Sequence, residues 1–166
     1  MALDYSETLI GLAELAVALA GFAGVAVAFG SRDHGAWHPG DRLRLHFLLE
    51  SSLAAGGFAI LTLVLLHALP DSEALPWQLG SALWALYMPL SLWASHRRIE
   101  ENRTKHGDID QFANRIVFSI FAFLIAAQIV NVVLWQDFFP LLAALCFNLA
   151  GAAMQFLRLI RSVFHE

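Results

Sequence analysis

The chain has 166 residues, of which 58% are hydrophobic and only 14% are charged, and its formal net charge is -4. An ordinary soluble domain carries about 25% charged residues, so this composition excludes a typical soluble fold and indicates a membrane protein. The acidic balance also excludes the basic surface that attracts nucleic acid, and no nucleic-acid partner is expected.

Five segments lack formal charge over roughly the 20 residues that a helix needs to cross the hydrocarbon core of a bilayer. No alternating pattern typical of a β-barrel appears, so the sequence predicts helices. The predicted spans are Leu15–Gly30, Ser51–Leu69, Leu75–Ser95, Ile116–Gln136 and Phe138–Leu157. The fold class is therefore predicted to be all-α, a polytopic transmembrane bundle of five helices. We expect residues 1–166 to form a single membrane domain, with helices at about 5–30, 41–69, 75–106, 109–136 and 138–161.

The first segment is extended outward by Leu9–Ala13 across an ionisable residue, Glu14, which lies roughly 10–12 Å below the outer boundary at 1.5 Å per residue. A charged carboxylate near a helix centre costs about 2.5–3.5 kcal/mol on insertion scales, so it needs a proton, water or a polar partner. Gly11, Ala18 and Gly21 share its helical face, and this pattern predicts that Glu14 points into protein. Two interpretations stay open: a carboxylate that lines an ion pathway, or a contact that fixes helix packing.

Small residues also cover a second face of the first helix. This ladder comprises Ala16, Ala20, Gly24 and Ala28. Two small-residue faces predict close packing on two sides, and Gly56 and Gly57 would permit a similar approach on the second helix. We therefore expect a homo-oligomer with the first helix at its centre; the alternative is that this helix forms the core of a monomer.

The second helix carries Glu50 one turn after His46, and their i,i+4 spacing lets the two side chains pair. Arg42 and Arg44 are close by in the sequence. One interpretation of this inner rim is a solvated group of charges, and the other is a charged gate at a pore mouth. In the second interpretation, Glu14 and Glu50 are two stations of one ion path.

The turn between the first two helices holds Asp33, His34, His38 and Asp41, which offer nitrogen and oxygen ligands. Their spacing matches no helical metal motif, so no bound metal and no cofactor are predicted. No nucleophile, base or metal set of a known catalytic motif is present, and we expect that the chain is not an enzyme.

Three amides lie at membrane depth in the last two helices: Gln128, Asn131 and Asn148. Counted from the helix ends, Gln128 and Asn148 reach a depth similar to that of Glu14, and Asn131 lies somewhat shallower. The four residues are predicted to form one polar layer. The alternative is that each amide makes a separate interhelical hydrogen bond. A short turn around Gln136 and Asp137 further predicts that these two helices form a tight antiparallel hairpin.

The basic residues predict the orientation, because Lys and Arg in short loops stay on the cytoplasmic side. All 10 fall in the first and third connections or after the fifth helix, which predicts an outside N-terminus and a cytoplasmic C-terminus. The largest extramembrane piece, residues 96–112, is a candidate docking surface for a protein partner.

The leading functional hypothesis is a small homo-oligomeric ion channel or ion transport protein. Its pathway for protons or cations would be lined by Glu14, Gln128, Asn131, Asn148 and Glu50. The alternative is a non-conducting scaffold or accessory subunit that binds a protein partner. In a general way the chain resembles small membrane proteins of bacteria, which implies a bacterial inner membrane, and no residue roles follow from this resemblance.

Overall fold

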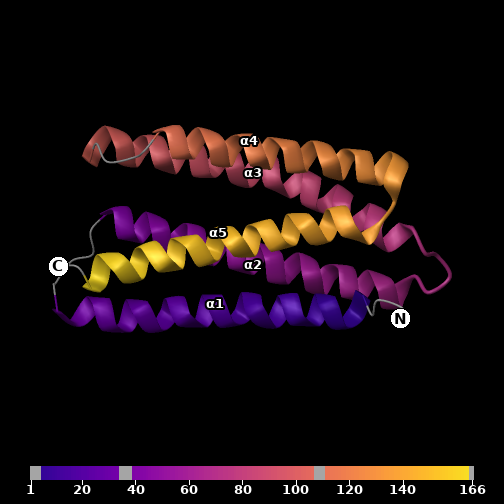
Figure 1. The fold of residues 1–166 in the computed structure, drawn as a ribbon, viewed down its shortest axis with the longest axis horizontal. Coiled ribbons are helices and arrows are strands. Elements are labelled where there is room, and N and C mark those ends of the chain that lie inside the picture. Colours follow the sequence, from indigo (N-terminus) through magenta and orange to yellow (C-terminus); the bar gives the residue numbers. More distant parts are fainter. Residues whose placement is uncertain (1–4, 34–38, 107–110, 165–166) are drawn as a thin grey trace.

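The computed structural model describes residues 5–33, 39–106 and 111–164, and over these residues the regular elements are helices alone (Figure 1). They are α1 (Tyr5–Asp33), α2 (Pro39–Ala68), α3 (Leu75–His106), α4 (Gln111–Val130) and α5 (Phe138–Phe164). A single π-helical turn, η1 (Asn131–Trp135), continues α4. The predicted all-α fold class is confirmed.

Local sequence explains where the helices begin. At the start of α3, the Ser72 hydroxyl accepts a hydrogen bond from the Leu75 backbone N–H at 3.2 Å. Pro76 follows in the first turn, where its missing N–H is not needed. At the start of α5, a carboxylate oxygen of Asp137 accepts a hydrogen bond from the Phe139 N–H at 3.1 Å. Each side chain satisfies a backbone donor that has no partner within the helix.

The helices run alternately up and down, so α1, α3 and α5 end where α2 and α4 begin (Figure 1). The central helix is α2, which packs against α1, α3 and α5. By contrast, α4 packs mainly along α3 and touches α5 only slightly. The predicted tight hairpin of the last two helices is therefore wrong over most of their length. Their contact beyond the turn includes the rings of Phe121 and Phe147, with centroids 5.1 Å apart.

The core lies where α1, α2, α3 and α5 meet. Trp84 of α3 and Leu141 and Leu145 of α5 are fully buried in it, together with Ala59 of α2. An aromatic group closes one end of this core, where the ring centroids of Trp77 and Phe138 are 5.1 Å apart. Burial of such large apolar side chains holds the helices together.

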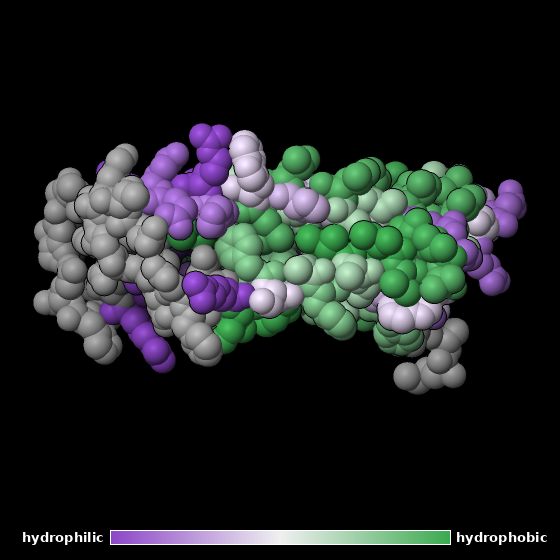
Figure 2. Space-filling model, turned by 90° about the horizontal axis from the view of Figure 1, so that it is seen from above, coloured by the Kyte–Doolittle hydropathy of each residue, from purple (hydrophilic) through white to green (hydrophobic). Residues whose placement is uncertain are grey.

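Within the residues that the structure describes, four helices are long and apolar enough to cross a membrane, in the segments Tyr5–Val25, Gly40–Ala68, Arg115–Trp135 and Phe138–Arg161. The remaining helix, α3, is less apolar, because Gln78, Tyr87 and Pro89 interrupt its charge-free segment. Large apolar side chains stay exposed along the bundle, among them Val17, Leu86 and Phe123. Figure 2 shows an apolar belt between two hydrophilic ends. These features indicate a membrane protein, since water would not tolerate such a belt.

The charged residues divide between the two ends of the bundle. All 10 Lys and Arg residues lie in the helices toward the end where α1, α3 and α5 finish, which we call the basic end. The opposite end, which we call the acidic end, carries Glu7, Asp71, Glu73 and Asp137. The acidic end therefore has no Lys or Arg, whereas the basic end carries all of them together with acidic residues such as Glu50 and Glu101.

Candidate functional site

Glu14 is exposed on the outer surface of α1, so the prediction that it points into the protein is wrong for a single chain. The residues of α1 that face the bundle are Leu9, Ala16 and Ala23, with exposed fractions of 1%, 2% and 0%. Glu14 precedes Ala16 by two residues and so stands about 200° around the helix from it, at about 100° per residue. The bundle uses one small-residue face of α1 and leaves the other uncovered.

The uncovered face of α1 contains Gly11 and Gly21, which were predicted to pack. A Cβ atom added at either glycine would meet nothing within 4 Å in the described part of the chain. The same holds for Gly24 of the Ala16 ladder, so the bundle covers that ladder only in part. Glu14 lines a shallow groove on this face, between Ile10 and Val17 of α1 and Ile60 of α2. Ala20, another predicted packing residue, is half-buried.

Only one of the two predicted glycines of α2 makes a close helix contact. A Cβ at Gly56 would lie 3.0 Å from the Cβ of Ala16, so this glycine lets α1 and α2 approach each other. Gly57 is exposed and packs against nothing within 4 Å in the residues described. Sequence reasoning missed Gly80 of α3, where a Cβ would lie 2.9 Å from Leu141 Cδ2 and 3.0 Å from Thr62 Oγ1. Gly80 thus sets the spacing of α3 from α2 and α5.

Asn131 organises the turn between α4 and α5. Its side-chain amide donates to the Asp137 carbonyl oxygen at 2.9 Å and accepts from the Asp137 N–H at 3.0 Å. It also donates to the hydroxyl of Ser81 on α3 at 2.8 Å. Gln136, between them, adopts a left-handed conformation with φ of 55°. The amide therefore has a structural role, as the alternative of separate hydrogen bonds predicted.

The other two buried amides, Gln128 and Asn148, differ in their hydrogen bonding. Gln128 donates through Nε2 to the Pro140 carbonyl oxygen at 2.7 Å, which ties α4 to the first turn of α5. Asn148 is 1% exposed, and among the described residues neither polar atom of its side chain has a hydrogen-bond partner. Gln128, Asn131 and Asn148 all lie inside the bundle, whereas Glu14 lies outside it. The predicted layer of four residues is therefore not formed within one chain.

Glu50 is the centre of a charged group near the basic end. It pairs with His46 of the same helix at 3.2 Å, as predicted. From α3, the Ser91 hydroxyl donates to it at 2.6 Å and the Arg98 guanidinium at 3.1 Å. The sequence did not predict the contacts of Ser91 and Arg98 with Glu50, because spacing along the chain does not show which residues of two helices meet. Glu50 thus joins α2 to α3 in addition to forming the predicted rim.

The two arginines of the predicted rim lie apart from this carboxylate. Arg44 donates to Asp41 at 2.8 Å, in a pair three residues apart on the same helix. Arg42 is exposed, one turn before His46. The rim is therefore a set of surface charges around a half-buried carboxylate, and such exposed pairs contribute little to stability.

The described residues contain no group of three His, Cys, Asp or Glu side chains that could hold a metal ion. The side chains of Asp33, His34 and His38, which offered possible ligands, lie outside the described part of the chain.

Comparison with known proteins adds no identification: no family model, no curated protein and no solved structure matches this chain. The function of the chain is therefore inferred from the positions of its own polar residues.

Proposed function

We propose that this chain is a homo-oligomeric membrane protein whose copies meet through α1 and together form a pathway for protons or cations. The interface is the uncovered face of α1, defined by Gly11, Glu14, Ala18 and Gly21. The observation that carries the proposal is the exposure of Glu14 on a helix that is apolar enough to cross a membrane.

A carboxylate in this position needs a polar environment. Glu14 lies nine residues after Tyr5, about 13 Å along α1 at 1.5 Å per residue, so in a bilayer it faces hydrocarbon. An acidic side chain near a helix centre costs about 2.5–3.5 kcal/mol in that environment. Contact with other copies removes it from lipid and gives it carboxylates, water or a cation as partners. The resulting polar line through the interface is the proposed pathway.

Small residues beside Glu14 make this contact sterically possible. Gly11 and Gly21 have free space where a side chain would be, and Ala18 between them is also exposed. Membrane helices associate through such small residues, because their backbones can approach closely. The face that the single chain leaves uncovered is therefore suited to another copy of α1.

In the proposed arrangement all five helices cross the bilayer, including the less apolar α3, which runs alongside the others (Figure 1). The basic end then faces the cytoplasm and the acidic end faces outward, following the distribution of Lys and Arg. In a bacterium this membrane is the inner one. Asn131 and Gln128 hold the connection between α4 and α5 through their hydrogen bonds, so the proposed pathway does not include them.

The second candidate is a non-conducting scaffold or accessory subunit, in which the same face of α1 binds a different protein. The structural hydrogen bonds of Gln128 and Asn131 favour it, because they remove two polar residues from the list of pathway residues. The end of α3 from residue 96 onward is its candidate docking surface for a partner.

Flux of protons and small cations into liposomes separates the two candidates. For the pathway, we expect Glu14→Gln to reduce the flux at least tenfold while the oligomer stays assembled, since glutamine has nearly the same shape but does not ionise. A matched control is Glu73→Gln at the exposed acidic end, which should leave the flux unchanged. If the folded, inserted wild-type protein shows no flux, the scaffold is the better account.

A further inference from the structure

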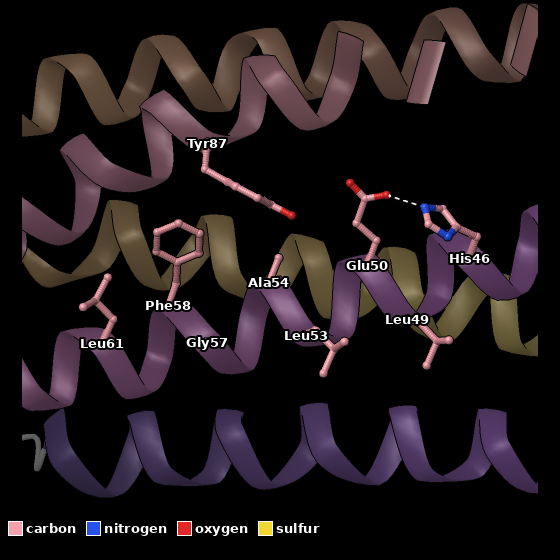
Figure 3. Close-up of a pocket in the computed structure, with 9 residues that line it drawn as sticks. All are labelled: His46, Leu49, Glu50, Leu53, Ala54, Gly57, Phe58, Leu61 and Tyr87. Atoms are coloured by element: carbon pink, nitrogen blue, oxygen red, sulfur yellow. Dashed lines mark ion pairs between the residues drawn. The ribbon is translucent and has the colours of Figure 1, made fainter. Parts of the chain in front are cut away.

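A groove of about 520 Å³ lies on the surface of α2 and shares no lining residue with the groove that contains Glu14. Seven of its lining residues are apolar or aromatic: Leu49, Leu53, Ala54, Gly57, Phe58, Leu61 and Tyr87. The other two are His46 and Glu50, at its end nearest the basic end of the bundle. Figure 3 shows Tyr87 reaching from α3 with its hydroxyl toward Glu50.

The apolar part of the groove is an elongated strip that is open to the surface of the bundle. It follows α2 for about three turns, from Leu49 to Leu61. Gly57 deepens its middle, because no atom of the described chain lies within 4 Å of where its Cβ would be. Leu53 stays 64% exposed beside it, so the wall is open to the surrounding lipid. A straight, flexible tail fits this shape better than a compact ligand.

The polar end of the groove carries an excess of basic groups. His46 and Arg98 both pair with Glu50, and their side chains remain 46% and 42% exposed. Arg42 lies one turn beyond His46 and is also exposed. A guanidinium has five N–H donors, so the bond from Arg98 to Glu50 leaves donors for an anion. The guanidinium of Arg98 and the imidazole of His46 thus pair with the Glu50 carboxylate, and the guanidinium of Arg42 lies one turn of α2 beyond them.

We propose that this groove binds an anionic phospholipid from the leaflet at the basic end. One acyl chain lies along Leu53, Gly57 and Leu61, and the headgroup phosphate contacts Arg42, His46 and Arg98. Glu50 positions the imidazole and one guanidinium, and it disfavours a second anion deeper in the groove. Charge complementarity selects an anionic lipid over a zwitterionic one, because basic side chains at a membrane surface attract anionic headgroups.

Native mass spectrometry of the delipidated protein tests this site, with phosphatidylglycerol and phosphatidylcholine of the same acyl chains as probes. We expect the first phosphatidylglycerol to bind at least about fivefold more tightly than phosphatidylcholine, the effect of roughly one basic contact. Gly57→Leu, which fills the groove, should weaken that binding about tenfold. The control Ala150→Leu, at an exposed position of α5, should not.

A second variant tests the headgroup contacts without changing the apolar part of the groove. Arg42→Gln combined with His46→Gln should abolish the preference for phosphatidylglycerol and leave the binding of phosphatidylcholine unchanged. Equal affinity of the wild-type protein for the two lipids would overturn the proposal. Unchanged binding in Gly57→Leu, with helix content preserved by circular dichroism, would overturn it as well. Glu14 takes no part in the site, so this test does not depend on the proposed ion pathway.

Discussion

The side-chain amide of Asn131 takes the place of a backbone partner at the turn between α4 and α5. It makes both hydrogen bonds with Asp137 and a third with Ser81. We expect Asn131→Leu to lower the free energy of unfolding by about 1–3 kcal/mol, because it leaves buried polar groups without partners. Circular dichroism during denaturation in detergent measures this loss. Ser81→Ala removes one bond and should cost about 0.6 kcal/mol. A stable Asn131→Leu protein with altered ion flux would instead show that the amide belongs to the pathway.

For Asn148, by contrast, we expect that removal of the side-chain amide does not lower the free energy of unfolding. Its amide is buried and has no hydrogen-bond partner among the residues described, so the folded protein gains little from its polar atoms. Replacing it with the similarly sized leucine should leave the free energy of unfolding unchanged or raise it by up to about 1 kcal/mol. The same denaturation measurement applies. A loss of more than 1 kcal/mol would mean that Asn148 has a polar partner in the membrane, such as bound water.

At the scale of the helices, the two kinds of glycine should respond differently to alanine. At Gly80 the added methyl group meets Leu141 and Thr62, and overpacking of this kind costs about 1–3 kcal/mol. At Gly21 the methyl group meets nothing within 4 Å in the described chain, and alanine favours a helix by about 0.5–1 kcal/mol over glycine. Thermal unfolding of both variants as detergent-solubilised monomers measures the stability of each one against the wild-type protein. Equal destabilisation would contradict the packing described here.

The rotation of α1 about its own axis could not be predicted from the sequence. Both faces are rich in alanine and glycine, so the pattern predicted two packing faces without showing which one contacts the bundle. Leu9 settles the choice in the fold, because it is buried against the core and shares its face with Ala16 and Ala23. That choice leaves Glu14 on the outside. A single sequence carries no signal for this rotation of the helix.

For the whole molecule, the helical fold was predictable because charge-free segments of membrane-spanning length stand out in composition alone. Contacts between segments far apart in the sequence were not predictable. Arg98 reaches Glu50 across 48 residues and Gln78 reaches the Val132 carbonyl across 54 residues. Such contacts depend on the rotation and relative height of each helix. The pairing of His46 with Glu50 was predictable, since both lie on one helix at a favourable spacing.

In the proposed assembly, the uncovered face of α1 contacts another copy of the chain. Disulfide crosslinking in native membranes tests it most directly, with Cys146 replaced by alanine and one cysteine introduced at a time. We expect Gly11→Cys and Ala18→Cys to yield crosslinked dimers on oxidation, and Ala122→Cys, on the exposed side of α4, to remain monomeric. Monomer alone for both α1 variants, in protein shown to be inserted, would contradict the assembly and with it the proposed pathway.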